Sequence, residues 1–98
     1  MIKRIVKLGF KPENIEDFKN IFENSKLKIR GFEGCNYLEL WQGKKDPTIF
    51  FTYSYWDSEA ALNNYRNSPL FKEVWAKTKV LFNQKPEAWS VYSVDKVD

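Results

Sequence analysis

Residues 56–75 read WDSEAALNNYRNSPLFKEVW, and they join a strand to two helices. Trp56 ends an aromatic run. Asp57 or Ser58 can cap a short helix through Tyr65, because either side chain can accept hydrogen bonds from the free N–H groups of a first helical turn. The pair Ser68-Pro69 then starts a second helix, since proline suits a first helical position. The stretch therefore predicts a strand end followed by a helix broken into two pieces.

Outward from this stretch, the hydrophobic pattern predicts the remaining elements. Large side chains alternate along the strands and keep a three-four spacing along the helices. The predicted elements are strands over residues 2–10, 35–42, 48–56 and 88–94, a helix over 12–30, and a last helix from residue 69 whose stripe is Phe71, Val74, Trp75, Thr78, Leu81 and Phe82. The order β-α-β-β-α-β predicts an α+β fold, a ferredoxin-like sandwich. We expect one domain over residues 1–98, because a chain of 98 residues builds only one small core.

Both faces of the predicted sheet carry bulky side chains. A ferredoxin-like sandwich lays its helices on one face, so the other face of a monomer should be polar. If Leu38 and Leu40 face the helices, the opposite face still offers Ile5, Tyr37, Trp41 and either the row Ile49, Phe51, Tyr53 or its neighbour. So much apolar surface predicts a homodimer formed by sheet-to-sheet packing.

Composition excludes several chemistries. The chain has no histidine and a single cysteine, Cys35, so it can form no Cys/His zinc site, no Ser-His-Asp or Cys-His nucleophile system and no intrachain disulfide. Its net charge of +3 is spread along the sequence without a basic block, which favours neither nucleic acid nor membrane as a partner. No targeting segment is visible at the start, and we expect a cytoplasmic protein.

The stretch from Trp56 to Trp75 resembles the signature of the antibiotic biosynthesis monooxygenase (ABM) superfamily. In that family a tryptophan ends the third strand, a short capped helix follows, and an S-x-x-F motif opens the last helix; here these are Trp56, Ser68 and Phe71. The resemblance follows the element order through most of the chain, but its specific part is about twenty residues. It implies a dimeric α/β barrel made from two ferredoxin-like sheets, in agreement with the homodimer expected from the exposed aromatic residues.

The resemblance does not extend to the haem-degrading branch of the superfamily. That branch needs an asparagine in the first strand, a tryptophan in the short helix and a histidine in the last helix as iron ligand. Val6, Tyr65 and Trp75 stand at those places. The superfamily also includes many members without known activity and a cofactor-free branch, in which a deprotonated quinol or polycyclic phenol reacts directly with oxygen. Resemblance to the cofactor-free branch implies a monooxygenase with no cofactor and no metal.

Such a reaction needs an apolar pocket, a positioned base or water, and donors that stabilise an oxyanion. We expect this pocket between the helices and the sheet. Tyr65 and Arg66 are the candidate catalytic residues, since a phenol can donate a hydrogen bond and a guanidinium can stabilise an anion. The candidate substrate-binding residues are Phe18, Phe22, Asn36, Tyr53, Trp56, Phe71, Trp75 and Thr78.

Simpler interpretations stay open for the same residues. Trp75 could fill the pocket as core, which would leave a structural protein that holds nothing. Arg66 could serve only in a surface salt bridge. Glu39, set among bulky residues, is expected to pair with Lys7 or Arg4 rather than to act as a base. The alternative to an enzyme is a non-catalytic or stress-related homodimer that binds a small molecule in this pocket.

Overall fold

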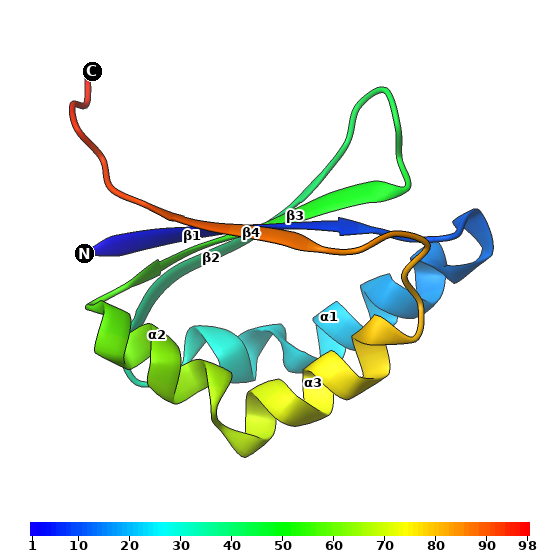
Figure 1. The fold of residues 1–98 in the computed structure, drawn as a ribbon, viewed down its shortest axis with the longest axis horizontal. Coiled ribbons are helices and arrows are strands. Elements are labelled where there is room, and N and C mark those ends of the chain that lie inside the picture. Colours follow the sequence, from blue (N-terminus) through cyan, green and yellow to red (C-terminus); the bar gives the residue numbers. More distant parts are fainter.

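Four antiparallel strands form one sheet in the order β2-β3-β1-β4, and all helices lie against one of its faces (Figure 1). The computed structural model describes residues 1–98. Its elements are β1 (Ile2–Gly9), the 3-10 turn η1 (Pro12–Asn14), α1 (Ile15–Arg30), β2 (Cys35–Gln42), β3 (Ile49–Trp56), α2 (Glu59–Arg66), α3 (Pro69–Lys79) and β4 (Glu87–Val91). This arrangement confirms the predicted α+β ferredoxin-like sandwich with its broken second helix.

The last strand is shorter than the sequence predicts. We expected residues 88–94, but β4 ends at Val91, which is paired with Lys3 of β1. Because β1 itself begins at Ile2, its backbone offers almost nothing to pair with the chain beyond Val91. The final residues therefore leave the sheet, on the side away from the helices (Figure 1).

Serine side chains start both α2 and α3. Ser58 Oγ accepts a hydrogen bond from the Ala61 amide at 3.1 Å, and Ser68 Oγ accepts one from the Phe71 amide at 3.1 Å. Asp57, the alternative cap, instead accepts a hydrogen bond from Asn36 Nδ2 at 2.6 Å. The two caps fix where the chain turns between α2 and α3, and so set where both helices lie over the sheet.

The core lies between the helices and the sheet in two clusters. Leu8, Phe10, Phe18 and Phe50 form the larger one, near η1 and the start of α1. Cys35, Trp56 and Leu62 form the other, under α2. Space remains between these clusters, and the candidate site occupies it.

Candidate functional site

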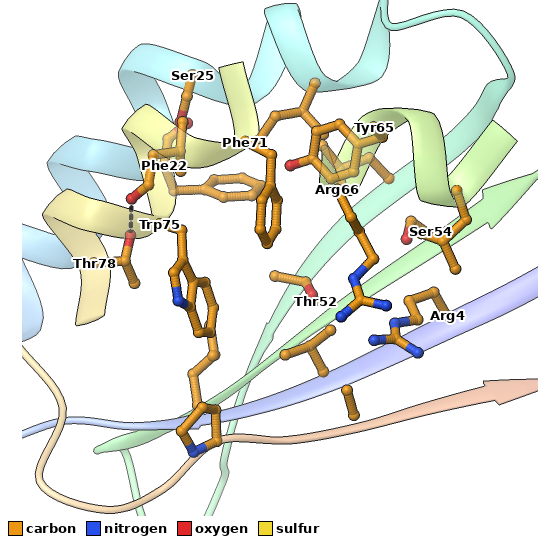
Figure 2. Close-up of a pocket in the computed structure, with 18 of the residues that line it drawn as sticks. Arg4, Phe22, Ser25, Thr52, Ser54, Tyr65, Arg66, Phe71, Trp75 and Thr78 are labelled. Carbon is orange, nitrogen blue, oxygen red and sulfur yellow. Dashed lines mark hydrogen bonds between the residues drawn. The ribbon is translucent and has the colours of Figure 1, made fainter. Parts of the chain in front are cut away.

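A cavity of about 360 Å³ lies between the three helices and the inner face of the sheet (Figure 2). Hydrophobic side chains make up 14 of its 22 lining residues, so its interior suits an apolar ligand. Ala88 of β4, paired with Val6, lines its edge and is exposed, which places an opening to solvent beside this strand. The cavity is therefore open rather than filled by core side chains.

Aromatic rings from α2, α3 and β3 form one wall. Tyr65 stacks on Trp56 with 4.8 Å between ring centroids, and Phe71 meets Tyr65 edge-on at 5.2 Å. Trp75 follows one helical turn later and is stacked with Phe71 at 5.7 Å. Trp75 thus lines the cavity as part of this wall and leaves the space beside it free.

The Tyr65 hydroxyl is available to a ligand. It makes no hydrogen bond within the protein, yet no fully buried polar side-chain atom in the structure lacks a partner. The hydroxyl oxygen therefore keeps some accessible surface, and Tyr65 lines the cavity. Burial raises the pKa of the Tyr65 phenol well above its usual value, with a smaller contribution from Cys35. The group is accordingly a neutral hydrogen-bond donor at physiological pH.

Several other hydroxyl groups at the cavity already have partners. Ser25 Oγ donates to the Ile21 carbonyl at 2.6 Å, Thr78 Oγ1 donates to the Val74 carbonyl at 2.7 Å, and Ser54 Oγ accepts from Trp56 Nε1 at 2.9 Å. These three hydroxyls are therefore already engaged in hydrogen bonds within the protein.

Thr52 differs from them. Its side chain lines the cavity from the middle of β3 and makes no hydrogen bond with the protein. Sequence reasoning missed Thr52 because both rows of β3 carry bulky residues, so that the pattern alone could not show which row faces the helices. The pairing of Thr52 with Val6 and Leu40 in the sheet decides it.

Two guanidinium groups converge at the cavity. Arg4 comes from β1 and Arg66 from the last turn of α2, and Figure 2 shows their side chains reaching toward each other. Sequence reasoning missed Arg4, although strand alternation puts it on the same face as Val6 and Leu8, both of which line the cavity. Its expected partner Glu39 lies on the other face, where it accepts a hydrogen bond from Trp41 Nε1 at 2.9 Å.

The structure brings eight of the ten predicted site residues to this cavity. They are the candidate catalytic residues Tyr65 and Arg66 together with Phe18, Phe22, Trp56, Phe71, Trp75 and Thr78. Their roles in binding and catalysis stay predictions.

Asn36 and Tyr53 do not reach the cavity. Tyr53 is paired with Ile5 and Glu39, so its side chain projects from the face that bears no helix. Asn36 lies at an irregularity at the start of β2, where it is exposed and hydrogen bonded to Asp57.

No group of three or more His, Cys, Asp or Glu side chains could hold a metal ion. The one cysteine, Cys35, is buried, and desolvation raises the pKa of its thiol. Its thiolate form is therefore disfavoured at neutral pH. No helix combines the length and hydrophobicity needed to cross a bilayer.

Comparison with known proteins identifies the family. Residues 1–77 match the sequence profile described as "Antibiotic biosynthesis monooxygenase" (ABM). The chain belongs to the ABM family. Its specific motif, from Trp56 through Ser68 to Phe71, lies within the matched residues, and all three side chains of that motif contribute to the cavity wall or to the helix that carries it.

Solved structures share the ABM fold at low sequence identity. A structure described as an antibiotic biosynthesis monooxygenase superimposes with a TM-score of 0.90 at 23% identity, over 97% of this chain and 100% of that one. A conserved protein from Methanosarcina mazei Go1 gives 0.87 at 23% identity, over 92% and 89%. A Mycobacterium tuberculosis protein gives 0.88 at 15% identity, over 99% and 98%. None of the curated proteins matches the chain.

Proposed function

We propose that this ABM-family protein is a monooxygenase that oxidises a small quinol or polycyclic phenol in the helix-sheet cavity, with molecular oxygen and without a cofactor. Family membership supports the general activity. The observation that carries the substrate class is the cavity of about 360 Å³ with its wall of stacked aromatic rings. Flat aromatic ligands pack well against such a wall, and a volume of this size is typical of small-molecule sites.

The proposed oxidation balances in atoms and electrons without an added reductant, as the oxidation of an anthrone shows. An anthrone that loses a proton from its ring-flanked CH₂ group gives an anion, which passes one electron to O₂. The two radicals combine and take up a proton to form a hydroperoxide, and loss of water then leaves a carbonyl group. CH₂ becomes C=O, one oxygen atom enters the product and the other enters water. The substrate supplies all the electrons.

The protein's own groups suit the anionic stage of this sequence. The Tyr65 hydroxyl is a neutral donor without a protein partner in a residue that lines the cavity, which suits a hydrogen bond to an oxygen on the substrate ring. Arg66 adds positive charge at the same cavity. Donors fixed in place before the charge develops stabilise an anion more than mobile water does. The opening beside β4 gives water access to receive the proton.

Oxygen uptake tests this function. The purified, metal-free protein is supplied with hydroquinones, dihydroxynaphthalenes and anthrones, and uptake is compared with the autoxidation blank. We expect Tyr65→Phe and Arg66→Ala each to lower the enzymatic rate by roughly tenfold or more, because each removes a group that stabilises the anion. Tyr92→Phe is the matched control, since Tyr92 is exposed in the C-terminal segment.

Two results would count against the monooxygenase. Uptake at the blank rate across the whole panel, with saturable binding of the same compounds, would favour the non-catalytic binding protein. Uptake that Tyr65→Phe and Arg66→Ala leave unchanged would place the reaction elsewhere on the molecule.

We further propose that two copies pair through the bare face of the sheet. No helix covers this face (Figure 1). It carries the apolar and aromatic residues Ile5, Tyr37, Trp41, Phe51, Tyr53, Tyr55, Trp89 and Val91, with Lys3, Lys7, Glu39 and Glu87 among them. Trp41 and Trp89 are 38% and 45% exposed, although indole rings favour burial. Trp41 stacks on Tyr53, and Tyr37 stacks on Tyr55, each at 4.6 Å, so the rings already form an ordered surface. Sedimentation at micromolar concentration is expected to give twice the chain mass of 11.7 kDa.

A further inference from the structure

Arg4 occupies an unusual place for a charged side chain. It lies on β1 in the row that faces the helices, between the buried Ile2 and the cavity-lining Val6. Arginine stays charged under all ordinary conditions, and buried or half-buried arginine normally has an anionic partner. The one side-chain hydrogen bond of Arg4 goes to Ser90 Oγ, at 3.0 Å, which supplies no negative charge.

Arg66 adds a second positive charge beside the first. Figure 2 shows both guanidinium groups at the sheet side of the cavity, each directed toward the other. Burial and the neighbouring Arg66 both lower the pKa of Arg4, in the direction that an unfavourable positive environment produces. The position of Arg66 in the last turn of α2 suits the helix dipole, but this does not account for Arg4.

No carboxylate neutralises the pair. All four ion pairs of the structure use lysine. Glu87 is the only acidic residue at the edge of the cavity, and its side chain projects from the opposite face of the sheet, where it pairs with Lys7 Nζ at 3.8 Å. Arg66 is exposed and Arg4 half-buried, so water screens part of their repulsion; an anion between them would remove the rest and gain charge-assisted hydrogen bonds from both guanidinium groups.

We infer that the cavity binds its aromatic ligand through an anionic oxygen group, a carboxylate or a phenolate, held between Arg4 and Arg66. The ring then lies along the wall of Tyr65, Phe71 and Trp75. This inference rests on the proposed function only in needing a cavity that admits an aromatic ring. It does not require that the ring be oxidised.

Binding of non-oxidisable probes tests the inference apart from turnover. Calorimetric titration compares 2-naphthoate with 2-naphthalenemethanol, a neutral compound of similar size. We expect naphthoate to bind roughly tenfold tighter or more, as charge-assisted hydrogen bonds require. Arg4→Gln and Arg66→Gln should each abolish this preference. Lys72→Gln removes one positive charge from an exposed position of α3 outside the cavity and should keep it.

A second probe distinguishes a phenolate from a carboxylate. At a fixed pH below its pKa, 4-nitrophenol should show increased phenolate absorbance on binding, because paired guanidinium groups favour the anion. A naphthoate preference identifies a carboxylate site. A phenolate signal without that preference identifies a phenolate site. Either result supports the inference if Arg4→Gln and Arg66→Gln each lose the naphthoate preference or the phenolate signal that the wild type shows.

Other outcomes overturn it. If the neutral alcohol binds as tightly as naphthoate and nitrophenol binds without added phenolate, the anion site is wrong while the aromatic cavity stands. If no probe binds, both the anion site and the proposed ligand cavity fail. Melting curves keep the variants interpretable: loss of one like charge should leave the melting temperature of Arg4→Gln unchanged or higher. Arg4→Lys and Arg66→Lys keep the positive charge but lose the paired guanidinium N–H donors, so they should keep part of the preference for naphthoate.

Discussion

Trp56→Ala is expected to lower the free energy of unfolding by about 3–5 kcal/mol, near the upper end for a single substitution. Trp56 is 1% exposed, stacks on Tyr65 and donates its indole N–H to Ser54 Oγ at 2.9 Å. The substitution opens a hole under α2 and removes the hydrogen-bond partner of a buried hydroxyl. Urea unfolding followed by circular dichroism measures the loss.

Trp75→Ala is the matched comparison, because it removes the same side chain from the cavity wall. Trp75 is half-buried beside existing open space, so we expect a loss of about half that of Trp56→Ala. An equal loss for the two variants would mean that Trp75 is core and that the protein has no open cavity in solution.

Ile5→Glu is expected to split the proposed dimer into monomers. Ile5 lies at the centre of the bare face, paired with Tyr53 of β3 on one side and Trp89 of β4 on the other. In a two-fold dimer the change enters the interface twice, and taking two carboxylates out of water costs several kcal/mol even with Lys3 and Lys7 in the same row of β1. Such a penalty raises the dissociation constant by roughly a thousandfold or more. Sedimentation velocity at micromolar concentration measures the change in mass.

Lys72→Glu serves as the control for this variant, because it adds the same carboxylate on the exposed side of α3. It should remain dimeric. A wild-type protein that sediments as a monomer would contradict the pairing outright. An Ile5→Glu protein that stays dimeric would move the interface to another surface.

The order of elements could be predicted because its signals are local. Ser58 and Ser68 sit where helix caps are needed, Pro69 follows the second cap, and alternation marks each strand. These features depend on a few neighbouring residues and are little affected by distant contacts. The end of β4 was missed because it depends on where β1 begins, which is a long-range constraint.

Site residues could be predicted only where they lie together on one face of a helix. Phe71, Trp75 and Thr78 share a helical stripe, so their common direction follows from spacing alone. For strands, the register between neighbours decides which row faces the helices. β3 has large residues in both rows, so Tyr53 was misplaced and Thr52 was overlooked. Arg4 was overlooked because a charged residue in a half-apolar strand suggested a surface partner, whereas the structure turns it toward the cavity.

The proposal that the cavity is the reaction site is tested most directly by filling it. Val74 of α3 lines the cavity, whereas Ala76 on the same helix is exposed. The measurement is oxygen uptake with the best substrate of the panel, for Val74→Trp against Ala76→Trp, once both variants are shown to be folded. If the reaction takes place in the cavity, Val74→Trp falls to the autoxidation rate and Ala76→Trp matches the wild type. Undiminished uptake by Val74→Trp would contradict the account.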